Sequence, residues 1–166
     1  MNDKYEIERK FLIKMPDVEY LRSLDGCVVK KLEQTYLLTT DGSTLRVRRV
    51  ETESGVTYRQ TGKIRISGMK CIEDEREITE EEYFEALKNA DPRLRTIKKT
   101  RYCIPHGKLT AEIDVYPFWS DKAVAEFELE SEDEQFSLPD YITVIKEVTD
   151  DVRFKNVRLA LELPQD

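Results

Sequence analysis

Charged residues occupy every second position in strand-like segments along most of this chain, and this alternation constrains the fold most strongly. The first such segment, residues 6–11, reads EIERKF. In a β-strand, Glu6, Glu8 and Lys10 share one face, and the residues between them share the other. The row has two interpretations. It is either the solvated face of an edge strand, or a site where carboxylates hold a magnesium ion and the lysine meets a phosphate.

The same alternation recurs in later segments, and most of these rows carry charges of one sign. The same-face rows are Arg46 and Arg48; Arg59, Thr61 and Lys63; Glu73, Glu75 and Glu77; Lys99 and Arg101; Glu112 and Asp114; and Glu126, Glu128 and Glu130. On a flat, solvent-facing sheet such rows form cross-strand ion pairs, which contribute only about 0.2–1 kcal/mol each. Inside a closed barrel, basic walls bind phosphates and acidic walls bind the metal that bridges them. The separation of signs favours the barrel.

Turn signals between the segments predict a mainly β (α+β) fold with a few short helices. The expected strands are residues 3–13, 30–39, 44–51, 56–66, 69–78, 97–104, 108–116, 122–130 and 141–147. The expected helices are residues 16–24, 79–90, 131–134 and a C-terminal helix from about residue 149. Closure into an eight-stranded antiparallel barrel removes the sheet edges and leaves room inside for one small ligand.

Composition narrows the function classes. A chain of 166 residues fits one domain, spanning residues 1–166, with a core of its own. The net charge of −7 lacks the basic balance typical of nucleic-acid binding. We find no apolar stretch long enough to span a membrane and no signal-peptide segment, so we expect a cytoplasmic protein. A monomer and a homodimer are both compatible with the sequence.

Histidine and cysteine chemistry is largely excluded. His106 is the only histidine and lies in a tight Pro-His-Gly turn, which excludes a histidine-dependent triad and a zinc site built on several histidines. Cys27, Cys71 and Cys103 are odd in number and lack metal-ligand spacing, so we expect reduced thiols. The candidate functional residues are therefore the carboxylates, lysines and arginines.

The motif EIERKFL resembles the E-x-E-x-K signature of the CYTH superfamily, the triphosphate tunnel metalloenzymes. The resemblance continues in order through EQTYL (33–37), LRVR (45–48), the strand ending at Lys63, EDERE (73–77), KKTRY (98–102), AEIDVY (111–116), AEFELES (125–131) and EVTDDVRFKN (147–156). One such motif is weak evidence, whereas the ordered set is strong. The resemblance implies an eight-stranded tunnel lined by acidic and basic side chains, a C-terminal helix at one mouth, a triphosphate-bearing small molecule as substrate, and Mg²⁺ or Mn²⁺ as cofactor.

The resemblance also implies roles at the matching positions. The implied metal ligands are Glu6, Glu8, Glu126, Glu128 and Asp114, and the other tunnel acids are Glu75 and Glu77. The implied phosphate-binding residues are Lys10, Arg46, Arg48, Lys63, Lys99, Arg101, Arg153, Lys155 and Tyr36. The implied catalytic set is Glu6, Glu8, Lys10, Glu128 and Lys99. Relatives commonly place an apolar residue before the tunnel lysine, whereas residues 61–63 read TGK here. Arg59 therefore competes with Lys63 as the inward cation.

Three functions follow from the resemblance. The first is metal-dependent hydrolysis of the terminal phosphoanhydride of tripolyphosphate, ATP or thiamine triphosphate. The second is a class IV adenylate cyclase, although the upstream His-Phe pair of those cyclases is absent here. The third is a module that binds polyphosphate or nucleotide without turnover, which would not need the acidic residues.

Several single residues keep a second interpretation. Tyr36 either orients phosphate or packs in the sheet. Glu73 and Glu130 read as rim or solvent residues. Trp119 reads as a loop anchor or as a cover over a tunnel mouth.

Overall fold

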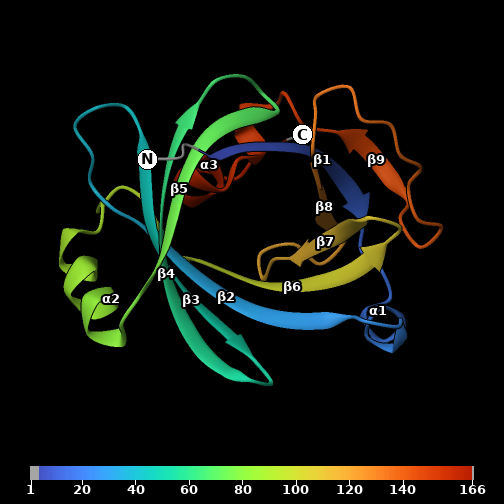
Figure 1. Cartoon of the computed structure of the whole chain (residues 1–166), viewed down its shortest axis with the longest axis horizontal. Helices are drawn as coiled ribbons and strands as arrows, with labels where there is room; N and C mark the ends of the chain where they lie inside the picture. Colours follow the sequence, from blue (N-terminus) through green and yellow to red (C-terminus); the bar gives the residue numbers. More distant parts are fainter. Residues whose placement is uncertain (1–3, 166) are drawn as a thin grey trace.

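Strands β1 to β8 close into an antiparallel barrel, which Figure 1 shows as a ring. The computed structural model describes residues 4–165, so residue 3 of the first predicted strand lies outside it. The strands are β1 (Lys4–Lys14), β2 (Val28–Tyr36), β3 (Thr44–Thr52), β4 (Gly55–Arg65), β5 (Lys70–Ile78), β6 (Ile97–His106), β7 (Leu109–Val115), β8 (Lys122–Leu129) and β9 (Val144–Glu147). The strand order is β5-β4-β3-β2-β6-β7-β8-β1, and a β5–β1 pairing closes the ring. The predicted mainly β barrel is confirmed.

Strand β1 takes part in three pairings and thereby closes the barrel. Residues 4–7 pair with β5, and residues 7–14 pair with β8 on the opposite edge. Beyond the end of the β5 pairing, residues 11–13 pair with the short strand β9. The length of β1 therefore lets one strand serve both the ring and the extra strand outside it.

Alternation along the strands divides the wall into a charged inner face and an apolar outer face. On β1, Ile7 and Phe11 belong to a buried apolar cluster, whereas Glu6, Glu8 and Lys10 line an internal cavity. The register agrees, because Glu8 and Lys10 face Glu128 and Glu126 of β8, which line the same cavity. The solvated edge-strand interpretation of this row is therefore wrong, and the inward-facing interpretation is confirmed.

The main hydrophobic core lies against the outer face of β1, β6, β7 and β8. Phe11, Tyr102, Ile113 and Phe127 pack there with Leu21 of helix α1 (Val18–Ser23). Phe136, Leu138 and Ile142, from the segment after β8, complete the cluster. Burial of these side chains outside the wall leaves the barrel interior free for polar groups.

A second apolar cluster fills one end of the barrel. Leu12, Tyr36, Ile97, Tyr116 and Val124 pack there with Trp119 and with the C-terminal residues Phe154 and Leu159. Those residues belong to the 3₁₀ turn η2 (Val152–Phe154) and the helix α3 (Asn156–Leu161), which appears within the ring in Figure 1. We call this cluster the apolar plug. Trp119 therefore anchors a closed end of the tunnel.

Two helix predictions need correction. Residues 131–134 form a turn, in which the Glu134 carboxylate accepts a hydrogen bond from the Glu130 backbone N–H at 2.7 Å. The C-terminal helix begins at Asn156, later than predicted, because Asp151 first caps η2. Helix α2 (Glu80–Ala86), continued by the 3₁₀ turn η1 (Leu87–Asn89), carries the predicted capping box at Thr79 and Glu82.

None of the helices within residues 4–165 is long and apolar enough to cross a lipid bilayer.

Candidate active site: a charged cavity inside the barrel

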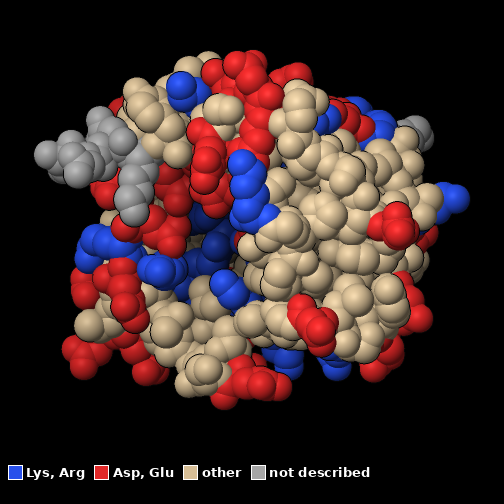
Figure 2. Space-filling model, turned by 45° about the vertical axis from the view of Figure 1, so that its right-hand side comes forward, with Lys and Arg blue, Asp and Glu red and all other residues tan. Residues whose placement is uncertain are grey.

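The barrel encloses a cavity of about 900 Å³ whose lining is dominated by ionisable side chains. Figure 2 shows blue lysine and arginine atoms gathered in a hollow, with red carboxylate residues beside it. The predicted site residues that line the cavity are Glu6, Glu8, Lys10, Tyr36, Arg46, Arg48, Lys63, Glu75, Arg101, Glu126, Glu128 and Lys155. One enclosed space therefore collects both the acidic and the basic rows.

The acidic wall is formed by β1 and β8. Glu8 is the direct cross-strand partner of Glu128, and Lys10 that of Glu126. Burial, followed by the nearby Glu126 carboxylate, raises the pKa of Glu8 to about 7. Burial also tends to raise the pKa of Glu126, but Lys10 and Arg101 outweigh it and hold that pKa well below its usual range. Glu8 and Glu128 have no ion-pair partner within 4.0 Å among residues 4–165.

Across the β1–β5 closure, Glu6 and Glu73 share one lysine. The Lys63 Nζ lies 2.9 Å from Glu6 Oε1 and 3.6 Å from Glu73 Oε2. Burial and then Glu6 raise the pKa of Glu73 to about 8. Burial opposes ionisation of Glu6 too, but hydrogen bonding with Glu73 and the charge of Lys63 lower its pKa to about 2. Glu73 therefore holds the proton of the pair, and its predicted position as a rim or solvent residue is wrong.

The basic wall crowds several arginines together. Arg46 is buried, and its Nε has no hydrogen-bond partner in the described part of the chain. Arg48 donates two hydrogen bonds to Gln34 Oε1, at 3.1 and 3.0 Å. Burial, followed by the charges of Arg46 and Arg101, lowers the pKa of Arg48 to about 9. This wall has donors and positive charge available for an anion.

Lys99 and Asp114 share the strand faces of the lining residues Arg101 and Glu112, but are not themselves among the residues that line the cavity. Asp114 is fully buried and accepts hydrogen bonds from Lys99 Nζ at 2.8 Å and from Arg101 Nε and Nη2 at 2.7 and 2.9 Å. Both carboxylate oxygens are thus occupied. Asp114 shares Arg101 with Glu112 and Glu126, and its two hydrogen bonds fix the position of that guanidinium.

Two more predicted residues lie outside the cavity lining. The Arg153 guanidinium is exposed and donates to the carboxylate of Asp151, with Nη2–Oδ2 at 2.6 Å. Lys155, two residues later, does line the cavity, and its Nζ donates to the Gly68 carbonyl at 2.8 Å. Glu77 is exposed near the end of β5.

The cavity lining also resolves the Arg59–Lys63 alternative and contains residues that the sequence did not predict. Arg59 and Lys63 both line the cavity, because they lie four residues apart on the same face of β4. The unpredicted lining residues include Lys30, Arg65, Glu73, Glu112 and Arg158. Alternation indicated Glu112, which shares its face with Asp114. On its face of β2, Lys30 is accompanied only by uncharged side chains, so the row does not show the charge alternation that marked the other strands. Nothing in the sequence pattern indicated Arg158 on α3.

The acidic wall fits a divalent metal ion. Carboxylate oxygens are the donors that Mg²⁺ and Mn²⁺ prefer. Facing like charges such as Glu8 and Glu128 repel each other, and a dication between them would relieve that repulsion. Burial and then the nearby Glu126 carboxylate raise the pKa of Glu8, and a bound dication would offset both effects by stabilising the ionised carboxylate.

A family model, a relative of known function and a solved structure all match this chain over most of its length. The CYTH domain family matches residues 4–154. The inorganic triphosphatase of Nitrosomonas europaea is 38% identical over 166 residues, which cover 96% of this chain and 99% of that protein. A solved structure described as an inorganic triphosphatase has a TM-score of 0.59 and 34% identity, covering 96% of this chain and 97% of its own.

More distant structures share the fold alone. An adenylyl cyclase candidate from Hippeastrum, described as having a dominant triphosphatase activity, has a TM-score of 0.56 and 18% identity. The match covers 76% of this chain and 80% of the Hippeastrum chain.

Proposed function

This chain belongs to the CYTH domain family, and from that premise we propose that it is a divalent-metal-dependent triphosphatase that hydrolyses the terminal phosphoanhydride of inorganic triphosphate. One observation carries the proposal. Within a single cavity, a wall of carboxylates faces arginines whose charges are not fully neutralised. A metal–triphosphate complex is complementary in charge to both walls. Its dication would bind the acidic wall, and its phosphates would bind the basic wall.

We assign the metal to the acidic wall, with Glu6, Glu8, Glu126 and Glu128 as its ligands. When bound, Mg²⁺ or Mn²⁺ would neutralise phosphate charge and lower the pKa of a coordinated water. No histidine is required for this chemistry. A neighbouring carboxylate that does not bind the metal would accept the water proton.

The phosphates contact the basic wall. Arg46 and Arg48 present planar guanidinium groups, which bind phosphate oxygens in two-point fashion. Arg101 is held rigidly by Asp114, so little side-chain entropy is lost when it binds a phosphate. Lys10, Lys63 and Lys155 supply further positive charge around the same space. Lys99 supports this arrangement through its hydrogen bond to Asp114, whereas Arg153 and Glu77 lie outside the cavity lining.

The cavity lining favours an inorganic over a nucleoside substrate. Tyr36 is the only aromatic side chain among the described lining residues, and it packs into the apolar plug. A nucleobase therefore finds no aromatic surface on which to stack. A cyclase or an ATP-specific enzyme would need such a contact or an equivalent one.

A substrate panel tests the proposal. The protein is incubated with tripolyphosphate, ATP and thiamine triphosphate, each with Mg²⁺, with Mn²⁺ or with a chelator. We expect phosphate release that is fastest from tripolyphosphate and absent with the chelator. Cyclic AMP formation would support the cyclase instead, and tight binding without any product would support the non-catalytic module.

We also infer a cytoplasmic setting, because the three cysteines are free thiols and two of them are only partly buried.

A further inference from the structure

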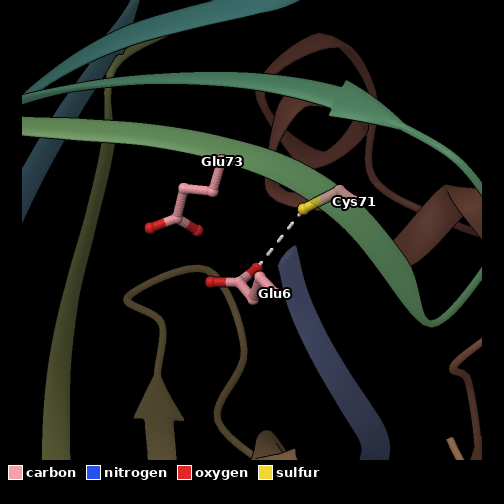
Figure 3. Close-up of side chains that lie close together, drawn as sticks. All are labelled: Glu6, Cys71 and Glu73. Carbon is pink, nitrogen blue, oxygen red and sulfur yellow. Dashed lines mark hydrogen bonds between the residues drawn. The ribbon is translucent and has the colours of Figure 1, made fainter. Parts of the chain in front are cut away.

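Glu6, Cys71 and Glu73 form a second kind of cluster, at the closure between β1 and β5. Glu6 is the direct cross-strand partner of Cys71, and Glu73 follows two residues later on the same face of β5. One potential ligand atom from each residue lies within 4.8 Å of the other two. Figure 3 shows the Cys71 sulfur and the Glu73 carboxylate both directed toward Glu6. We call these three residues the thiol cluster.

Within residues 4–165, one oxygen atom of the thiol cluster lacks a hydrogen-bond partner. The Glu73 Oε2 is buried and accepts no hydrogen bond from the described residues. The Lys63 ammonium is 3.6 Å from that atom and 2.9 Å from Glu6 Oε1, so one cationic group contacts both carboxyl groups. The structure thus already places a cation between these carboxylates. A divalent ion would satisfy both more completely than the ammonium does.

The geometry of the cluster matches a sulfur-containing metal site. The Cys71 Sγ lies 3.7 Å from Glu6 Oε1. A tetrahedral Zn²⁺ has bonds of about 2.3 Å to sulfur and about 2.0 Å to oxygen, which sets sulfur–oxygen separations of about 3.5 Å. Cys71 and Glu6 therefore need little rearrangement to accept such an ion, and one Glu73 oxygen lies within 4.8 Å of both ligand atoms. The strand ladder that pairs Glu6 with Cys71 fixes their backbones beforehand.

We propose that the thiol cluster binds a thiophilic divalent cation of the Zn²⁺ or Cd²⁺ class, and that this ion competes with Lys63 for Glu6. The Cys71 thiol and the Glu73 carboxyl group each lose a proton when they bind the metal, so two protons are released to solvent. Mg²⁺ gains little from sulfur, so Cys71 gives the site its preference for softer ions. Because Glu6 also belongs to the proposed Mg²⁺ site, we expect Zn²⁺ to inhibit hydrolysis. That inhibition rests on the proposed function, whereas the binding does not.

Cadmium spectroscopy tests the binding without any substrate. A Cys27→Ser/Cys103→Ser double variant leaves Cys71 as the only thiol. Titration with Cd²⁺ should produce a saturable thiolate-to-metal charge-transfer absorption at one ion per chain. The band should also appear in the unaltered chain and lose the same intensity in Cys71→Ser, with circular dichroism confirming the fold. Absence of the band from the double variant, or its persistence in Cys71→Ser, would overturn the site.

Competition with Lys63 needs a matched control. Lys63→Met should raise the affinity for Cd²⁺ by about tenfold or more, because the competing ammonium is removed from Glu6. Arg59→Met removes another cavity cation, which pairs with Glu75 at 3.1 Å instead. We expect a clearly smaller gain in Arg59→Met. Equal gains in the two variants would show a general effect of charge and would contradict competition at Glu6.

Discussion

Glu8 on β1 and Glu128 on β8 are direct cross-strand partners, and both carboxylates line the same cavity. Like charges placed directly opposite each other destabilise a sheet, so this pairing has a cost in the metal-free protein. A sequence selected only for stability would place opposite charges there, as the next pair, Lys10 and Glu126, does at 3.2 Å. We interpret the Glu8–Glu128 pair as the centre of the proposed metal site.

Glu8→Gln should abolish most of the hydrolysis. The substitution keeps the shape of the side chain and removes the charge that the proposed metal site needs. We expect kcat to fall by at least about 100-fold, a loss typical when one group that stabilises transition-state charge is removed. Steady-state phosphate release with Mg²⁺ measures it. Glu130→Gln, at an exposed position just beyond the end of β8, is the matched control and should keep its activity.

Glu8 should make the metal-free protein less stable as the pH rises. The pKa of Glu8 is about 7 in the fold and 4.5 in the unfolded chain, so the folded state binds its proton more tightly between those values. Stability therefore falls as the pH rises from about 4.5 through about 7. Melting temperatures in a chelator should drop more steeply for the unaltered protein than for Glu8→Gln. Parallel pH profiles would contradict the assignment, and Mg²⁺ should restore stability at high pH only in the unaltered protein.

Arg46→Met should separate binding from stability. The Arg46 Nε is buried without a hydrogen-bond partner, so removing the guanidinium should cost the fold little. The Kd for tripolyphosphate should rise by about 10-fold to 100-fold, because a hydrogen bond to a charged group contributes about 1.5–3 kcal/mol. Calorimetric titration and thermal melting measure the two effects. A large loss of stability with unchanged affinity would show that Arg46 is structural.

Asp114→Asn, unlike Arg46→Met, should lower the free energy of unfolding by a large amount. It leaves Lys99 and Arg101 buried without their shared counter-charge. Loss of one partner in a buried pair costs about 3–5 kcal/mol. Asp151→Asn, which breaks a largely exposed pair with Arg153, should cost less than about 1 kcal/mol. Urea unfolding of both variants makes the comparison, and equal costs would contradict the role of Asp114.

Alternation and turn chemistry made most of the barrel predictable. A period of two places Glu6, Glu8 and Lys10 on one face whichever strands pair, so the sequence alone grouped them correctly. The inward direction of that face required closure of the ring, which depends on long-range pairing between β1 and β5. The family resemblance supplied that step.

The failures have local physical causes. The pattern at residues 131–134 has the polar signature of a capped helix, but no apolar face follows it to stabilise one. Asp114 carries the charge of a metal ligand, yet two neighbouring cations occupy its oxygens, and such pairing depends on tertiary contacts. Arg153 and Lys155 are two residues apart at the boundary between η2 and α3. The chain is not a β-strand there, so alternation does not predict which side chain faces the cavity. The three-dimensional structure shows that Lys155, and not Arg153, lines the cavity.

Diffraction from crystals of the unaltered protein, grown with Mn²⁺ and an imido analogue of tripolyphosphate that resists hydrolysis, tests the central claim most directly. We predict an anomalous manganese peak on the acidic wall beside Glu6 and Glu8. Phosphate density should lie against Arg46 and Arg48 in the same cavity. Manganese and phosphate found only on the outer surface, with an empty barrel, would contradict the account.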